Sequence, residues 1–158
     1  GIYTVELDES KKKDEQWYIN TNITYSFDGT NATGSYGDAT ARAHADTKWT
    51  QEEIDDNEAP EGADTDTVKV EGLKTILIKT IKAQAEGELN KTDWYITRKS
   101  EKNTAIPSAI TTHRDAVRSK QASMETAITN ASDTPALETL YTRNDSGVRP
   151  LGDLPILE

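Results

Sequence analysis

The front of the chain alternates apolar and polar side chains with a period of two. In the stretch QWYINTNITYSF at residues 16–27, one parity carries the apolar side chains: Trp17, Ile19, Ile23, Tyr25 and Phe27. Only Thr21 interrupts this row. Such alternation is typical of a half-buried strand. Because β-branched and aromatic residues also dominate IYTVEL at residues 2–7, the two stretches predict an antiparallel hairpin.

Turn and cap residues follow this predicted hairpin. Asp28-Gly29 begins a glycine-rich segment, and a weaker third strand is expected near residues 35–41. Thr50 precedes Glu53 by three residues, which is the spacing of a capping box and predicts a short helix at residues 50–57. Residues 1–57 are therefore expected to form a β-rich N-terminal module.

The next segment is acidic and lacks large apolar side chains. Residues 55–66 read DDNEAPEGADTD, with Pro60 and Gly62 among the carboxylates. This composition is typical of a linker. We place the linker at residues 58–70, followed by a helical module at residues 71–143.

Helical periodicity dominates the rear of the chain. Residues 71–90 carry an apolar stripe: Leu73, Ile76, Leu77, Ile81 and Leu89. Thr92 and Asp93 offer a cap for a short helix that continues to about residue 102. The break at residues 103–107 ends in a proline, which disfavours helical geometry in the residue before it.

A long helix with a heptad seam is expected at residues 109–131, with Ser108 as its cap. Four apolar residues lie seven apart: Ile110, Val117, Met124 and Ala131. This seam should pack on another helix, either within the chain or in a second copy. Asp133 and Pro135 predict the start of a further short helix.

The last residues, 144–158, contain two glycines and two prolines and are expected to be irregular. Leu151, Leu154, Ile156 and Leu157 nevertheless make this tail apolar enough to dock, either on its own body or on a neighbour. The predicted fold class is α+β. It consists of an N-terminal antiparallel β-hairpin or small sheet, an acidic linker, and a C-terminal helical hairpin or small bundle.

Charge and composition narrow the classes of partner. Eighteen basic and 28 acidic residues give a net charge of −10, which opposes binding to nucleic acid or to an anionic membrane surface. No run approaches the roughly 20 apolar residues that span a bilayer, and the first residues predict no secretion signal. Only 34% of residues are hydrophobic, so the core should be thin, which predicts either an elongated shape or stability shared with partners.

The residues give little support to catalysis. The two histidines, His44 and His113, lie on opposite sides of the predicted linker, and the chain has no cysteine. The acidic clusters lack the spacing of a calcium loop, and the glycines are not followed by the Lys-Ser/Thr pair of a phosphate-binding loop. We therefore predict no enzyme, no cofactor and no metal site.

Aromatic side chains are the remaining candidates for binding. Tyr18, Trp49 and Trp94 are predicted to contact other proteins, because aromatic residues anchor such contacts at low entropic cost. The alternative for Trp17 and Trp94 is that they fill the thin core. Exposed aromatics on an acidic surface would also suit stacking on sugars, which keeps glycan binding open.

One part of the chain resembles a known family. Thr92-Asp93-Trp94, then Ile106-Pro107-Ser108, then Arg114 and Arg118 follow each other at set spacings, and the ending PLGDLP at residues 150–155 fits the same pattern. Over residues 92–142 the chain resembles small tail-fibre-assembly-type proteins of tailed bacteriophages, in which such residues form a helical module. The β-rich front has no counterpart in this resemblance.

The resemblance implies a place in a phage tail. The leading hypothesis is a virion structural or adaptor protein, made in the host cytoplasm and attached at the fibre or baseplate region to other phage tail proteins, with self-association possible. The alternatives are a tail-fibre assembly chaperone absent from the particle and a glycan-binding tip module. The residues expected to make contacts are Tyr18, Trp49, Trp94, Arg114, Arg118, Leu151, Leu154 and Ile156.

Overall fold

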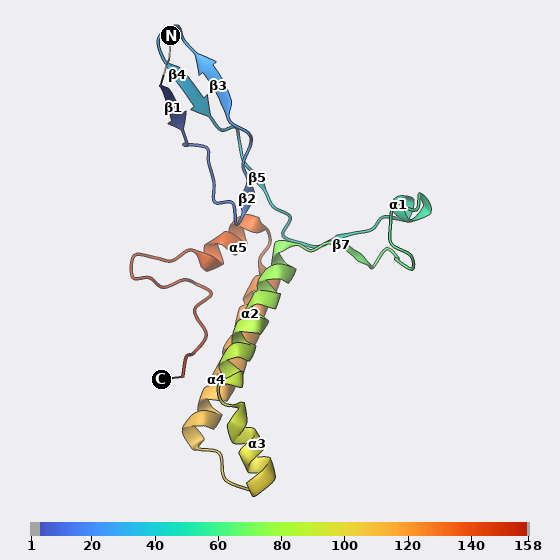
Figure 1. Cartoon of the computed structure of the whole chain (residues 1–158), viewed down its shortest axis with the longest axis vertical. Helices are drawn as coiled ribbons and strands as arrows, with labels where there is room; N and C mark the ends of the chain where they lie inside the picture. The colour runs from blue at the N-terminus through green and yellow to red at the C-terminus, as the bar shows by residue number, and fades with distance from the viewer. Residues whose placement is uncertain (1–3, 158) are drawn as a thin grey trace. The chain divides into compact units, whose positions relative to one another are not determined.

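The computed structural model describes residues 4–157 and is a mixed α+β protein with small sheets and helices (Figure 1). The chain divides into two compact units, Gly1–Ala43 and His44–Glu158, called here the N-unit and the C-unit. The sequence predicts the first boundary at residue 57, whereas in the structure the segment 44–57 belongs to the C-unit. Ile2 and Tyr3, part of the expected first strand, lie outside the described residues.

The N-unit contains a three-stranded sheet with the order β1-β4-β3. Its strands are β1 (Val5–Asp8), β3 (Thr24–Phe27) and β4 (Ala32–Ser35). The central β4 pairs parallel with β1 and antiparallel with β3. A small sheet is thus confirmed, but the predicted pairing of the first strand with residues 16–27 is wrong. The partner of β3 is instead β4, which follows it directly across the Asp28-Gly29 turn.

That turn is fixed by one carboxylate. Asp28 Oδ1 accepts hydrogen bonds from the backbone N–H groups of Thr30 and Asn31, each at 2.8 Å. Gly29 has a φ of 100°, a conformation that costs glycine no steric energy. These bonds return the chain into β4 beside β3.

The stretch 16–27 does not form one strand. It contains β2 (Tyr18–Ile19), which pairs with β5 (Thr40–Ala41), and then β3. Between them, the side chain of Asn20 exchanges two hydrogen bonds with the Lys13 backbone, at 2.9 and 2.8 Å. Thr21 Oγ1 accepts a hydrogen bond from Gly37 N at 2.6 Å. At residues 20 and 21, hydrogen bonds between side chains and backbone therefore take the place of strand-to-strand backbone pairing.

The C-unit begins with an arm that contains most of the acidic segment. Its two strands, β6 (Thr47–Lys48) and β7 (Val68–Val70), pair antiparallel, and α1 (Gln51–Asp55) lies between them in sequence. The capping box is confirmed: Glu53 N donates to Thr50 Oγ1 at 3.3 Å, and Thr50 N donates to Glu53 Oε2 at 3.0 Å. Residues 58–70, expected as a linker, thus include a strand of this arm.

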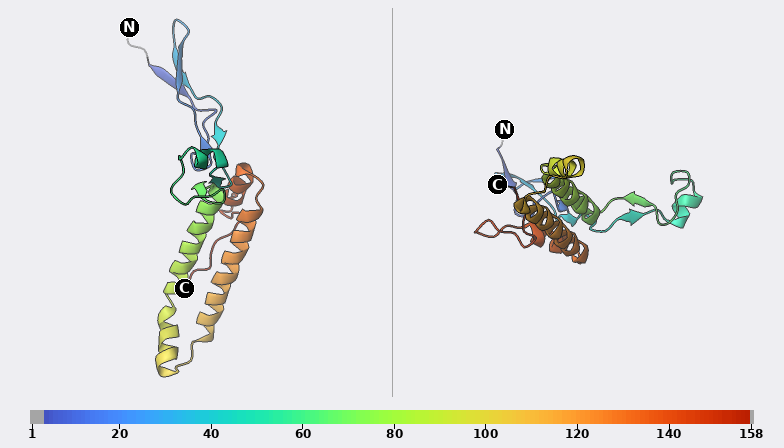
Figure 2. Two further views of the ribbon diagram at one scale, coloured as in Figure 1. Left: turned by 90° about the vertical axis from the view of Figure 1, so that its right-hand side faces the viewer. Right: turned by 90° about the horizontal axis from the view of Figure 1, so that it is seen from below.

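Two long helices form the body of the C-unit. They are α2 (Leu73–Asn90) and α4 (Ser108–Asn130), which lie side by side along their length (Figure 2). The predicted heptad seam is confirmed, because Ile110, Val117, Met124 and Ala131 are all buried. The α2 side of the contact is also buried: Leu73, Leu77, Ile81 and Ala85. The seam therefore packs within the chain.

Two shorter helices complete the C-unit, α3 (Asp93–Lys102) and α5 (Thr134–Tyr141). The predicted break is confirmed, and α3 ends at Asn103 in a left-handed conformation with φ 52°. The predicted Ser108 cap is wrong: Pro107 occupies the cap position of α4, where no side chain caps the helix. Asp133 does cap α5, since Ala136 N donates to its Oδ1 at 2.8 Å.

Candidate protein-interaction surfaces

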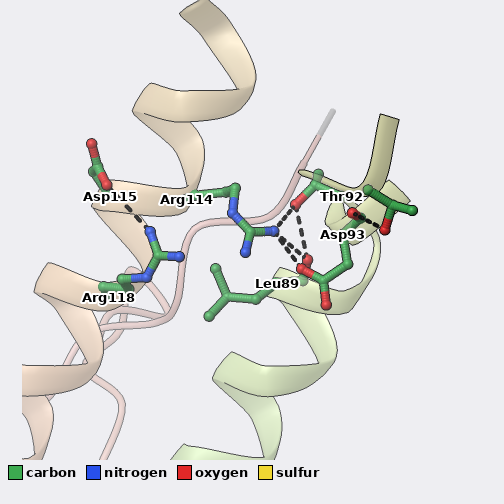
Figure 3. A network of polar contacts seen from close by, with 7 residues as sticks. Leu89, Thr92, Asp93, Arg114, Asp115 and Arg118 are labelled. Atoms are coloured by element: carbon green, nitrogen blue, oxygen red, sulfur yellow. Dashed lines mark hydrogen bonds and ion pairs between the residues drawn. The ribbon is translucent and has the colours of Figure 1, made fainter. Parts of the chain in front are cut away.

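Arg114 joins three helices through a single nitrogen atom (Figure 3). Its Nη1 lies 2.8 Å from Leu89 O at the end of α2, 2.6 Å from Thr92 Oγ1, and 2.8 Å from Asp93 Oδ1 at the start of α3. Thr92 is fully buried and donates its hydroxyl to Leu89 O at 2.9 Å. Because Arg114 belongs to α4, this network fixes the α2–α3 joint against the long helix.

The two arginines of the family-like pattern therefore have different surroundings. Arg114 is predicted to contact a partner, but it is only 8% exposed, and its Nη1 donates to Leu89, Thr92 and Asp93 of the chain itself. Arg118, one turn further along α4, is exposed and forms an ion pair with Asp115 at 3.3 Å. It also borders an open groove of about 540 Å³ along α4, lined by Gln121, Ala122, Glu125, Thr126, Thr129 and Asn130.

Helix α3 carries an exposed aromatic and cationic surface. Trp94 is 51% exposed, and its ring centroid lies 3.8 Å from that of Tyr95. The guanidinium carbon of Arg98 lies 4.7 Å from the Trp94 centroid and 5.3 Å from the Tyr95 centroid. No described residue of α3 is buried. Trp94, Tyr95 and Arg98, called here the α3 surface, thus form a stacked group of the kind enriched in protein contacts.

Trp49 lies on the arm and is half-buried. Lys69 Nζ lies 4.5 Å from the centroid of its ring and also forms an ion pair with Glu53. Lys69 donates a hydrogen bond to the Glu53 carboxylate, and the Thr50 backbone N–H donates another. Together they lower the pKa of Glu53 to about 2. One face of the Trp49 ring therefore has an ammonium group of the same arm above it.

The three-stranded sheet of the N-unit exposes an apolar face. The register places Ala32 between Val5 and Phe27, and Gly34 between Leu7 and Tyr25. Directly paired residues lie on the same face of a sheet, and the four large side chains are exposed by 47% for Val5, 48% for Leu7, 69% for Tyr25 and 51% for Phe27. We call these six residues the sheet face. Sequence reasoning identified the parity of β3 but expected that row to be half-buried.

Tyr18 does not lie on an exposed polar face, as the sequence suggested. It is 6% exposed, and Lys13 Nζ lies 4.3 Å from the centroid of its ring. The expectation failed because Tyr18 belongs to the short β2–β5 pair and not to one long strand shared with β3. The prediction that Tyr18 contacts a partner at the surface is therefore wrong.

The tail docks on its own body through Leu151. Leu151 is buried, its N–H donates to Leu140 O at 3.0 Å, and its carbonyl accepts from Lys120 Nζ at 2.8 Å. Beyond it, Leu154 is half-buried and Ile156 is 70% exposed. The sequence left open whether the tail docks on its own body or on a neighbour. Leu151 docks on the chain's own body.

One acidic residue, Asp153, ties the tail to the end of α5. Asp153 accepts hydrogen bonds from Arg143 at 3.0 and 3.1 Å and forms an ion pair with Arg149 at 2.8 Å. The hydrogen bond with Arg143 is the main cause that lowers the pKa of Asp153. The apolar residues that follow Asp153 therefore extend from a residue held by two arginines.

Residues 4–157 contain no helix with the length and apolarity needed to cross a membrane. In the same range, His, Asp and Glu side chains form no group of three or more that could hold a metal ion. His113 Nε2 is buried without a hydrogen-bond partner among the described residues. Comparisons with family models, with curated proteins and with solved structures give no match.

Proposed function

We propose that this chain is a structural or adaptor protein of a tailed-phage virion, attached at the fibre or baseplate region through protein–protein contacts. The first support is the resemblance of residues 92–142 to small tail-fibre-assembly-type proteins. The second is the distribution of exposed aromatic and apolar side chains over both units. The net charge of −10 adds a reason to favour proteins over nucleic acid as partners.

The observation that carries the proposal is the contact network around Arg114. Thr92, Asp93 and Arg114 belong to the residue pattern on which this resemblance rests. Arg114 is more than 20 residues from the other two in sequence, yet it donates hydrogen bonds to both at the α2–α3 joint. The pattern thus corresponds to a defined piece of structure. Trp94 follows directly after this joint and is half exposed, so the joint holds an aromatic side chain at the surface.

The two units offer different kinds of docking surface. The N-unit has the sheet face and two edge strands, which suit contact with a β-rich neighbour. The C-unit has the α3 surface and the exposed end of the tail at Ile156. An adaptor needs at least two such surfaces, and a chain with a thin core gains stability from both.

Mass spectrometry of purified virions of the encoding phage tests this proposal. We expect peptides of this chain in gradient-purified particles, at a constant ratio to known tail proteins through repeated purification and a high-salt wash. An assembly chaperone would be abundant in the infected-cell lysate and lost from the particles. Loss of the chain from the particles would contradict the adaptor role and support the role of assembly chaperone.

Glycan binding is the second candidate, and the exposed Trp94 ring is the observation that favours it. Sugars stack on exposed aromatic faces, and Arg98 beside the ring could bind a carboxylate-bearing sugar. A glycan array with the full chain tests this candidate. Binding that is lost in Trp94→Ala and kept in Trp49→Ala would support it, whereas an array without signal would remove it.

A further inference from the structure

The sheet face has large side chains on its two outer strands and small ones in the middle. Val5 and Leu7 of β1 and Tyr25 and Phe27 of β3 flank Ala32 and Gly34 of the central β4. The side chains of Ile23 and Tyr25 both cover Gly34, because a Cβ built on Gly34 would lie 3.0 Å from Ile23 Cγ2 and 3.0 Å from Tyr25 Cε1. At the other end, the small Ala32 lies between Val5 and Phe27.

No charged residue belongs to the sheet face. The charged residues of β1, Glu6 and Asp8, have the opposite parity to Val5 and Leu7 and so lie on the other side of the sheet. This distribution matters for self-association, because two copies that each carry a net charge of −10 repel each other over most of their surfaces. An uncharged face is where two copies approach with the least repulsion.

The size of the face sets the strength to expect. Full side-chain areas of about 150–250 Å² for aromatics, and somewhat less for aliphatics, give roughly 400 Å² of exposed surface for the four large residues. Two such faces in contact would bury roughly 800 Å², which is below the range of about 1,200–2,000 Å² of stable complexes. The association should therefore be weak and reversible.

We propose that the sheet face packs on the sheet face of a second copy of this chain. Sheets stack about 10 Å apart with their apolar faces together, and a two-fold axis makes the contact self-complementary. The inference rests on the sheet alone and is independent of the phage assignment.

Sedimentation velocity of the full chain over a wide range of concentration tests the proposal first. We expect the mean mass to rise from that of a monomer toward twice that value, and Phe27→Lys to abolish the rise. Ser26→Lys is the matched control, because it adds the same charge to the neighbouring residue of β3 on the opposite face. Circular dichroism checks that both variants keep the fold.

Cross-linking tests the contact without disturbing a large side chain. The chain contains no cysteine, so every cross-link comes from the residue introduced. With a bismaleimide about 10 Å long, matched to the spacing between stacked sheets, Ala32→Cys should form covalent dimers at least several-fold faster than Thr33→Cys, its neighbour on the other face. Equal rates, a dimer that survives Phe27→Lys, or a chain that stays monomeric at every concentration would each overturn the proposal.

Discussion

Arg114 illustrates how a residue predicted to act at the surface can instead act inside. The sequence identified it through its spacing from Arg118 and from the Thr92-Asp93 pair, but spacing does not report burial. In the structure one guanidinium nitrogen lies within 2.8 Å of three oxygen atoms from two other helical segments. Arginine suits this place because its donors stay charged and planar when buried.

The Arg114 network should stabilise the C-unit measurably. Hydrogen bonds to charged groups contribute about 1.5–3 kcal/mol each and are not additive, so we expect Arg114→Ala to lower the free energy of unfolding by about 2–4 kcal/mol. Arg118→Ala is the control on the same helix, and its exposed ion pair should be worth less than about 1 kcal/mol. Urea denaturation measures both changes, and equal losses would contradict the assigned role of Arg114.

Glu53 provides a pH-dependent test of the arm. Its pKa is lowered from 4.5 to about 2 by Lys69 and by the Thr50 backbone. A lowered pKa means that its stabilising contribution is complete above about pH 4.5 and is lost as the pH falls through about 2. An NMR titration of the Glu53 carboxyl group should show this low midpoint, and Lys69→Gln should raise it toward 4.5.

Lys48→Gln is the matched control for that titration. Lys48 belongs to the same arm but pairs with Asp66, so its removal should leave the midpoint of Glu53 in place. A midpoint near 4.5 in the unchanged protein would show that Lys69 and Glu53 are not paired in solution.

At the scale of elements, local patterns predicted helices better than strands. The heptad seam of α4, the Asp133 cap of α5 and most of the apolar stripe of α2 are present, because each depends on residues a few positions apart. Ile76 of the predicted stripe is instead 46% exposed. The strands of the N-unit have only two to four residues, and side-chain bonds such as those of Asn20 hold the chain between them. The alternation of apolar residues in β3 could be predicted from the sequence, but the strand that pairs with β3 could not.

The start of α2 depends on a residue that no local pattern could identify. Its cap position is occupied by Gly72, which has no side chain to accept a hydrogen bond. Asp46, from the beginning of the arm, accepts instead from Gly72 N at 2.7 Å and from Thr75 Oγ1 at 2.9 Å. The hydrogen bond from Gly72 is the main cause that lowers the pKa of Asp46.

Removal of this remote cap should loosen both the arm and the first turn of α2. We expect Asp46→Ala to cost about 1–2 kcal/mol, the range for lost caps, and to speed amide hydrogen exchange at Gly72. Asp46→Asn keeps an acceptor oxygen and should cost less. Because the pKa of Asp46 is lowered, its contribution should fade below its usual pKa of 3.8 as the pH drops. Unchanged exchange at Gly72 in Asp46→Ala would rule out the cap.

At the scale of the whole molecule, the low apolar content has a visible consequence. Many of the buried apolar side chains fill the contact between α2 and α4, while the large ones of β1, β3 and α3 remain largely exposed. The sequence predicted a thin core and an α+β fold, but not that the acidic segment would form an arm. The exposed residues are the basis for proposing that partners complete the structure.

The central claim is that this chain occupies a fixed place in a phage tail. A cryo-electron microscopy reconstruction of the intact particle tests it most directly, with the α2–α4 pair and its α3 extension as the shape to locate. The account predicts density for these helices at the fibre or baseplate region, with the α3 surface in contact with another protein. A tail fully explained by other proteins would contradict it, as would this chain located only in the head.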